Sequence, residues 1–374
     1  MAPKILIAGS GPGALEAALS LCGGEHLACD VTLISPQLEF VYRPNMVMQP
    51  FGAAPPPAYR VSDILEGLPV TQYQGLIERV DTAARKAWSP EGDEFDYDAM
   101  IVATGVATEA ELPAPAITIA TAGSMGELQA MVEAVDAGRV SRVVFTAIPG
   151  TRTWFLPMYE LALMTAARGT RTNNPLISIF TPESEPLEIF GHEHSRSVRG
   201  LTDEHGIQLI NGDSVASFDG RSFVSRSGEN EDADFVISMP RLSGRAPEGV
   251  PVNENGFIVV DDHMRALEGG EPVPGLFAIG DVTEFRVKQG GLASSQADVA
   301  TATIAADRGE RELPPAFDRI AEATLLGGEH RLPLRARIND GECESLPAEE
   351  LEGASKKIHS RLLSQRLDQI QPVA

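Results

Sequence analysis

The chain has 374 residues, of which 43% are hydrophobic, and a chain of this length can bury the cores of two or three domains. Its formal net charge of −23 argues against nucleic acid as a partner, because binding to phosphate groups requires basic patches. The three cysteines lack metal-type spacing, so we expect neither a metal site nor a disulfide scaffold.

The chain enters an apolar strand at once and contains no apolar run approaching about 18 residues. We therefore expect no signal peptide and no membrane span, and a cytoplasmic protein.

The first predicted strand, Lys4–Ala8, is followed by a glycine-rich turn and a good helix-forming sequence. In a strand–turn–helix unit of this kind the glycines serve a dinucleotide: the first permits the tight turn, and the second lets the backbone approach a pyrophosphate. The third small residue lets helix and strand pack closely, and the helix N-terminus favours the anion. An ordinary glycine turn is the alternative. The residues expected to bind a cofactor here are Gly9, Gly11, Pro12, Gly13 and Ala14.

A second strand, Val31–Ser35, should end beside this turn. An acidic residue that binds ribose usually stands at that end. This chain has Ser35, Pro36 and Gln37 instead, so we expect Ser35 or Gln37 to hydrogen-bond the ribose.

Two further motifs complete the pattern. Ala103, Thr104 and Gly105 end an apolar strand, and Gly280 and Asp281 end another near the C-terminus. An aspartate at the carboxyl end of a parallel strand is well placed to hydrogen-bond a ribityl hydroxyl. In this order the three motifs predict one FAD pocket built by two distant parts of the chain.

A small-residue helix predicted from Leu292 to Ala306 follows Lys288, Gly290 and Gly291. Its positive end and the lysine would face the flavin ring and stabilise the anionic reduced flavin. Leu292 begins this helix and is included in the expected cofactor site. The alternative for Lys288 is a surface lysine.

These motifs resemble those of the two-dinucleotide-domain FAD-dependent pyridine nucleotide-disulfide oxidoreductase superfamily, and within it the sulfide:quinone oxidoreductase-like branch. The resemblance runs from about Pro3 to Leu363 and includes Phe40–Pro44, Tyr159–Ala162 and Lys288–Ala293. It implies FAD, a quinone-type acceptor and often attachment to a membrane surface. The segment containing Arg43 and Pro44 resembles the one that passes the flavin, although Arg43 could equally hold an acidic neighbour.

The chain departs from this branch at the redox cysteines. Trp154 stands where the resemblance places a cysteine, five residues before Tyr159. Cys22 and Cys29 are expected to be small core or loop residues, and Cys343 lies in an acidic stretch beyond the other redox position. Cysteine-based sulfide oxidation is therefore not expected unless Cys343 folds back to the ring.

A second departure concerns nicotinamide binding. The strand Ser141–Ala147 is followed by Ile148–Thr153, which contains one glycine, so the backbone cannot approach a diphosphate as it does in a full fingerprint. We expect a middle domain that keeps its shape and has lost most of its nicotinamide site.

Three residues are candidates for the chemistry. The resemblance suggests that Glu160 relays protons to the acceptor, since quinone reduction takes up two protons. The alternative is a helix-start glutamate favoured by the dipole. Trp154 and Phe155 could line an apolar pocket for a flat ring, or simply pack in the core.

His192 and His194 do not form a chelating face, because positions two apart on a helix point in different directions.

The expected fold is α/β, with two Rossmann-like three-layer domains and a short C-terminal region. Residues 1–105 and 244–310 should form the FAD-binding domain, residues 106–243 the middle domain and residues 311–374 the C-terminal region.

The C-terminal region contains a basic stretch from Lys356 to Leu367 that predicts an amphipathic helix. One interpretation is a helix lying on an anionic membrane, which would place the protein peripherally on the inner face of the membrane. The alternative is a helix packed on its own domain or on a second subunit of a homodimer. Its apolar face would consist of Ile358, Leu362, Leu363, Leu367 and Ile370.

The leading hypothesis is thus an FAD-dependent oxidoreductase that takes electrons from a small-molecule donor and passes them through FAD to a quinone-type acceptor. Lys288 and Glu160 would be its catalytic residues. The alternatives are an NAD(P)H dehydrogenase that uses the altered middle domain, and a flavin-binding partner or assembly subunit without turnover.

Overall fold

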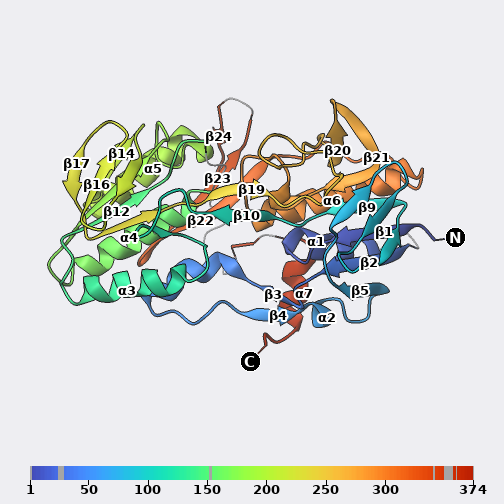
Figure 1. The fold of residues 1–374 in the computed structure, drawn as a ribbon, viewed down its shortest axis with the longest axis horizontal. Helices are drawn as coiled ribbons and strands as arrows, with labels where there is room; N and C mark the ends of the chain where they lie inside the picture. Colours follow the sequence, from blue (N-terminus) through green and yellow to red (C-terminus); the bar gives the residue numbers. More distant parts are fainter. Residues whose placement is uncertain are drawn as a thin grey trace.

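The computed structural model describes residues 2–23, 29–150, 154–339, 342–348, 357–358 and 360–373. Two sheets with parallel cores organise the chain, one toward each end of the molecule, and C-terminal strands lie between them (Figure 1). The expected α/β class with two Rossmann-like units is confirmed.

The first sheet has six strands, in the order β20-β21-β9-β1-β2-β5. Neighbouring strands are parallel except for the edge strand β20, which runs antiparallel to β21. The side chains of Ile5 to Ala8 are all buried, as expected for a strand covered on both faces. The bounds are β20 Arg265–Glu268, β21 Glu271–Ala278, β9 Ala99–Val102, β1 Lys4–Ala8, β2 Asp30–Ser35 and β5 Val70–Gln74.

Two helices pack against each other beside this sheet, α1 (Pro12–Cys22) and α6 (Gly290–Asp307). Smaller antiparallel units and short helices join the strands. They are β3 Glu39–Val41 with β4 Ala58–Arg60, the 3-10 helix η1 Arg43–Phe51, α2 Val61–Ile64, η3 Gly280–Val282, and the sheet of β6 Arg79–Asp81, β7 Lys86–Trp88 and β8 Glu94–Asp96.

The second sheet has five strands, in the order β11-β18-β12-β13-β14, all parallel. Its strands are β11 Ile117–Thr118, β18 Phe235–Ser238, β12 Arg142–Thr146, β13 Leu176–Thr181 and β14 Gln208–Asn211. The accompanying elements are α3 Ser124–Asp136, α4 Leu156–Gly169, η2 Glu188–Phe190, α5 Gly191–Glu204, and the antiparallel sheet of β15 Val215–Phe218, β16 Ser222–Ser225 and β17 Asn230–Asp232.

An antiparallel pair of strands, β10 (Val106–Glu109) and β19 (Arg241–Gly244), connects the two sheets. The chain therefore leaves the first unit and returns to it along adjacent strands. This is how residues after 244 come to complete a sheet begun at the N-terminus.

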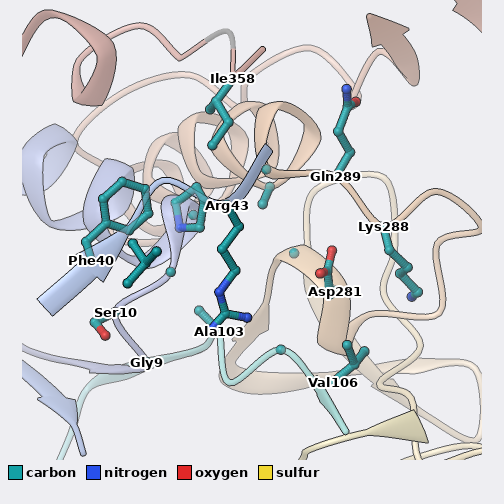
Figure 2. A pocket seen from close by; sticks show the side chains of 18 of the residues that line it. Gly9, Ser10, Phe40, Arg43, Ala103, Val106, Asp281, Lys288, Gln289 and Ile358 are labelled. Carbon is teal, nitrogen blue, oxygen red and sulfur yellow. The ribbon is translucent and has the colours of Figure 1, made fainter. Parts of the chain in front are cut away.

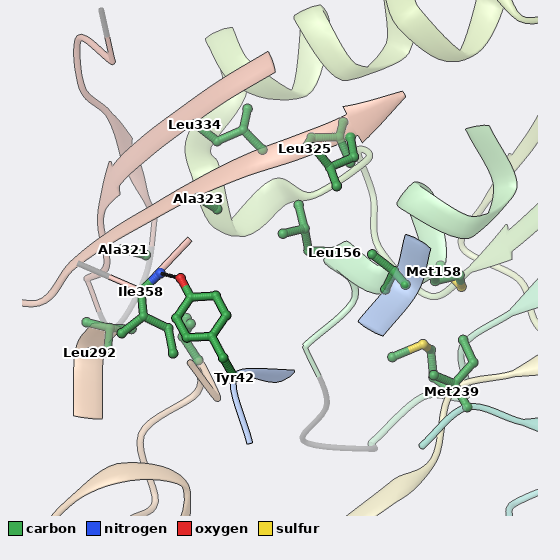
Figure 3. Close-up of a cluster of buried hydrophobic side chains, with 14 of the residues drawn as sticks. Tyr42, Leu156, Met158, Met239, Leu292, Ala321, Ala323, Leu325, Leu334 and Ile358 are labelled. Carbon is green, nitrogen blue, oxygen red and sulfur yellow. Dashed lines mark hydrogen bonds between the residues drawn. The ribbon is translucent and has the colours of Figure 1, made fainter. Parts of the chain in front are cut away.

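The C-terminal region forms a three-stranded antiparallel sheet that the sequence analysis did not predict. Its strand β22 packs on α4. Side chains from this sheet, from α4 and α6, and from the segment around Tyr42 share one core (Figure 3). The sheet thus ties both dinucleotide-type units together. Its strands are β22 Ile320–Gly327, β23 His330–Arg337 and β24 Glu344–Ser345.

The final helix, α7 (Leu363–Gln369), is shorter than predicted and packs on its own domain against α1 and α2. Ile358, Leu363 and Leu367 are buried, as the alternative of a helix packed on its own protein expects, whereas Leu362 and Ile370 of the same face are partly exposed. Residues 356 and 359 of the predicted helix lie outside the described residues. Within the described part of the chain, no helix combines the length and apolar character needed to cross a membrane.

Candidate functional site

A cavity of about 590 Å³ opens at the carboxyl ends of β1, β2, β9 and β21 (Figure 2). Residues from α4, β22 and the C-terminal tail also line it, so three distant parts of the chain meet there. Of the predicted cofactor residues, those that line it are Gly9, Gly11, Pro12, Gly13, Ser35, Gln37, Arg43, Pro44, Ala103, Thr104, Gly105, Gly280, Asp281, Lys288 and Gly290.

Ala14, Gly291 and Leu292 were predicted in the cofactor site but do not line the cavity. Ala14 and Leu292 are buried in the core, where each points into the packing around its own helix. A helix that points its N-terminus at a cavity turns only part of its first turn toward it, so these two residues lie behind the cavity wall.

The glycines of the first motif make distinct contacts. Gly9 has φ +127°, and a Cβ added there would lie 2.3 Å from the carbonyl oxygen of Ala103. A Cβ on Gly13 would lie 2.9 Å from the carbonyl oxygen of Ala293, so Gly13 permits α1 to approach α6. This contact between two helices is distinct from the close packing of helix on strand that the sequence analysis expected of the third small residue, Ala14. A Cβ on Gly11 would meet nothing within 4 Å.

Two helix N-termini face this cavity without a side-chain cap. The residues Gly11 and Pro12 at the start of α1, and Gln289 and Gly290 at the start of α6, all line it. Uncapped N–H groups and the helix dipole favour an anion. Thr104 also lines the cavity, and its buried hydroxyl has no hydrogen-bond partner within the described residues. An elongated anionic cofactor such as FAD fits these features.

Two serine hydroxyls lie at the end of β2, where the sequence predicts ribose binding. The Ser35 hydroxyl lies 2.7 Å from the hydroxyl of Ser10 and accepts a hydrogen bond from the backbone N–H of Gln37 at 3.1 Å. Ser10 was missed by the sequence analysis, although its position between Gly9 and Gly11 would have been a signal. Neutral hydroxyls therefore replace the usual acid at the end of β2.

Lys288 is buried, with 7% of its surface exposed, so the surface-lysine alternative is wrong. Its Nζ donates to the carbonyl oxygen of Thr283 at 2.5 Å and lies 4.1 Å from the centre of the Phe257 ring. Burial raises the pKa of the Asp281 carboxyl, and the charges of Lys288 and Arg43 offset part of that rise. In this part of the cavity the charges of Asp281, Lys288 and Arg43 therefore compensate one another.

Glu160 lies in the second turn of α4, so the alternative of a helix-start glutamate does not apply. Its carboxylate is 1% exposed and accepts hydrogen bonds from Lys357 Nζ at 2.5 Å and from the backbone N–H of Leu326 at 3.1 Å. Burial raises the pKa of Glu160, while Lys357 and the Leu326 N–H act to lower it. Glu160 and Lys357 both line the cavity.

The two predicted pocket aromatics behave differently. Trp154 lines the cavity and makes an edge-to-face contact with Phe190 at a centroid distance of 5.5 Å. Phe155 does not line it, because it immediately precedes α4 and packs on the core there; Leu156 lines the cavity instead.

Several lining residues had no signal in the sequence analysis. Arg245, whose backbone N–H donates to Gly105 at 3.1 Å, comes from the connection between the sheets. Others come from the unpredicted C-terminal sheet and from the tail, and only the tertiary fold brings them to the cavity. They are Ala323, Thr324, Lys357 and Ile358.

None of the three cysteines, all within the described residues, lines the cavity. Cys22 and Cys29 hydrogen-bond to each other, which raises the pKa of Cys22 and lowers that of Cys29. Cys343 is half-buried, and burial raises the pKa of its thiol. Cys343 therefore does not fold back to the cavity.

The middle sheet has an acidic residue at the end of its second parallel strand, where a dinucleotide fold usually binds ribose. This residue, Glu183, is buried and accepts hydrogen bonds from the hydroxyls of Tyr159 at 2.8 Å and Thr181 at 2.9 Å. Burial raises its pKa to about 7. The carboxylate is turned into the domain and is not available to a ribose. Residues 151–153 of the preceding loop lie outside the described residues.

His192 pairs with Glu185 at 2.8 Å, and His194 bonds the carbonyl oxygen of Leu346 at 3.0 Å. Among the described residues, no cluster of three or more His, Cys, Asp or Glu side chains has the geometry of a metal site.

Comparison with known proteins finds a family match for part of the chain. Residues 159–309 match the family model of pyridine nucleotide-disulphide oxidoreductases. None of the curated protein sequences matches the chain.

Solved structures share the fold at low sequence identity. The sulfide:quinone oxidoreductase of Aquifex aeolicus has a TM-score of 0.77 at 21% identity, over 91% of this chain and 86% of that one. A ferredoxin reductase of Rhodopseudomonas palustris has a TM-score of 0.66 at 18% identity, over 91% and 83%. NDH2 of Plasmodium falciparum has 0.58 at 18% identity, over 76% and 64%.

The domain match and the shared fold agree with the resemblance found in the sequence. An FAD-dependent oxidoreductase fits the family match over residues 159–309 and the fold that the chain shares with these structures.

The two glycines of the turn should respond differently to a methyl group. Gly9→Ala forces a positive φ on alanine and a backbone clash, so we expect it to destabilise the protein by about 2 kcal/mol or more. Gly11→Ala should leave the thermal unfolding of the FAD-free protein unchanged and weaken FAD binding. Thermal unfolding and FAD titration check both. Equal stability losses in the two variants would contradict this assignment.

Glu183 should make stability depend on pH. Its folded-state pKa of about 7 exceeds the ordinary value of 4.5, so the folded protein binds the extra proton between these values. The contribution of Glu183 to the free energy of unfolding has its full value below pH ~4.5. It falls as the pH rises through about 7, by at most about 3 kcal/mol. Glu183→Gln should remove this fall and stabilise the protein at pH 8, as measured by urea unfolding. The exposed Glu193→Gln is the control, and an unchanged pH dependence in Glu183→Gln would refute the assignment.

Proposed function

We propose that this oxidoreductase takes electrons from a small-molecule donor and passes them through FAD to a quinone-type acceptor. The observation that carries the proposal is the buried Glu160–Lys357 pair in the cavity wall, 2.5 Å apart. A buried carboxylate with a raised pKa beside a lysine is a group suited to handling protons. Bound FAD would supply the carrier of two electrons between donor and acceptor.

The residues that would hold the cofactor follow from the cavity. The start of α1 and the backbone of Gly11 would hold the diphosphate, and Ser35 with Gln37 would hold the ribose. Asp281 would bind a ribityl hydroxyl. Lys288 and the start of α6 would place positive charge near the ring.

Proton handling would centre on the Glu160 carboxylate. Quinone reduction consumes two protons, and the Glu160 carboxyl oxygens can hold a proton in a place shielded from bulk water. Lys357 would keep the carboxylate from becoming too weak an acid, since its charge opposes the rise in pKa caused by burial. Trp154, Leu156 and Ala323 add apolar surface to the same cavity, as a flat ring requires.

The donor would not be oxidised by attack of a cysteine pair, since no cysteine lines the cavity. An NAD(P)H dehydrogenase is the less favoured alternative, because Glu183 is occupied by Tyr159 and Thr181. A flavin-binding partner without turnover is the second alternative. The lack of a cysteine in the cavity and the occupied Glu183 together favour it.

The acceptor can be tested without knowing the donor. We expect the purified protein to show a flavin absorbance band that NADH does not bleach under anaerobic conditions. After chemical reduction with dithionite, a short-chain quinone should restore the band within seconds. A band that stays bleached in excess quinone would overturn the proposed acceptor, and rapid bleaching by NADH would favour the dehydrogenase alternative.

Glu160→Gln should slow the return of the band with quinone by about 100-fold, since it removes the ionisable group. Its FAD content should be unchanged. Lys357→Met should raise the pKa of Glu160 and move the pH–rate profile to higher pH. The exposed Glu127→Gln on α3 is the control, and stopped-flow absorbance from pH 5 to 9 is the measurement. Parental rates in Glu160→Gln would remove this residue from the mechanism.

A further inference from the structure

The C-terminal tail contributes to the wall of the cofactor cavity. We define the strap as residues 357–358 and 360–370. Lys357 and Ile358 at its beginning both line the cavity, and Figure 2 shows Ile358 there. Ile358 lies against Gly290 at the start of α6, where an added Cβ would come within 3.0 Å of its side chain. The strap therefore covers the end of the cavity where α6 begins.

Besides the burial of Ile358, Leu363 and Leu367, the strap makes polar contacts with neighbouring elements. The backbone N–H of Ile358 donates to the Tyr42 hydroxyl at 2.9 Å (Figure 3), and Lys357 pairs with Glu160. Farther along, Arg361 pairs with Asp298 on α6 at 2.8 Å. The Arg366 guanidinium donates to the carbonyl oxygens of Asp63, Ile64 and Glu66.

One buried acid holds the middle of the strap. Glu16 is fully buried on α1, and its two carboxylate oxygens accept the backbone N–H groups of Leu362 at 2.8 Å and Leu363 at 2.7 Å. Glu16 lies four residues after Pro12, on the helix whose start lines the cavity. Hydrogen bonds to a buried charged acceptor are among the stronger ones in proteins.

Glu16 has no contact that would place it in cofactor chemistry, and it does not line the cavity. Among the described residues, the strap N–H groups and the nearby Arg361 offset the cost of burying its carboxylate, against the unfavourable charge of Asp298. Both carboxylate oxygens of Glu16 accept strap N–H groups, so the buried acid keeps these hydrogen bonds only while the strap is in place. Strap and cofactor helix are thus energetically coupled.

We propose that the strap is a latch that retains FAD, and that Glu16 is the positioning residue that keeps it closed. FAD enters and leaves when the strap detaches from α1 and α6. Bound FAD in turn favours the closed strap, because Lys357 and Ile358 contact the occupied cavity and the coupling is reciprocal. The inference rests on FAD binding in this cavity and not on the identity of donor or acceptor.

The first test is the rate of FAD release, followed by the rise of flavin fluorescence after dilution. Glu16→Ala should release FAD about tenfold faster, as loss of the charged acceptor requires. Arg361→Gln should accelerate release to a smaller extent, because its ion pair is partly exposed. Arg308→Gln, which removes an exposed ion pair with Glu310 away from the strap, is the matched control and should release FAD at the parental rate.

The second test separates a latch from a merely structural contact. Trypsin should cleave after Arg361 and Arg366 more slowly when the unmodified protein is saturated with FAD than when it is FAD-free, as seen by mass spectrometry of the fragments. This test stands even if Glu16→Ala fails to fold. Equal cleavage rates with and without FAD, or parental release from a folded Glu16→Ala, would overturn the proposal. Neither result depends on electron transfer, so failure of the proposed acceptor leaves the latch intact.

Discussion

The structure depends on the close approach of backbone segments at the carboxyl ends of the central strands of the first sheet. The absence of a side chain at Gly9 lets β1 end against the carbonyl of Ala103, and the absence of one at Gly13 lets α1 lie against Ala293 of α6. A methyl group at either position would push these segments apart. Because α1 and α6 both start at the cavity, their separation decides whether two helix N-termini can face one elongated anion. Cofactor binding is therefore a consequence of how closely two helices can pack.

Glu160 links the cavity to the middle unit and to the C-terminal region. It lies on α4 of the middle unit, accepts a hydrogen bond from β22 and pairs with Lys357 of the tail. A buried carboxylate of this kind is costly, and it is retained only when partners satisfy it from several sides. Replacing such a buried pair with apolar residues is often neutral or stabilising, so folding stability alone does not explain why this pair is present. The same buried residue, which contacts three regions of the chain, also lines the cavity.

The sequence predicted the first unit well because its signals are local. A strand, a glycine turn and a helix within about twenty residues follow from propensity and periodicity, and the strand before Gly280 is equally clear. The contribution of the tail was not predictable in this way. Lys357 reaches Glu160 across most of the chain length, and basic residues with an apolar face are compatible both with a membrane and with a neighbouring helix. Leu363 and Leu367 are buried against the first unit, and only the tertiary structure holds that information.

The charge inside the cavity differs in sign from the net charge of the chain. The chain carries a net charge of −23, which repels anions at long range, yet the cavity is lined by four basic side chains against three acidic ones. The basic residues are Arg43, Arg245, Lys288 and Lys357, and the acidic ones are Glu39, Glu160 and Asp281. Surface repulsion is screened within about 10 Å at ordinary salt, whereas charges inside a cavity interact in a medium of lower polarity. The local excess of positive charge therefore outweighs the distant negative charge for any ligand that has reached the cavity, and an acidic protein can hold an anionic dinucleotide without a basic surface.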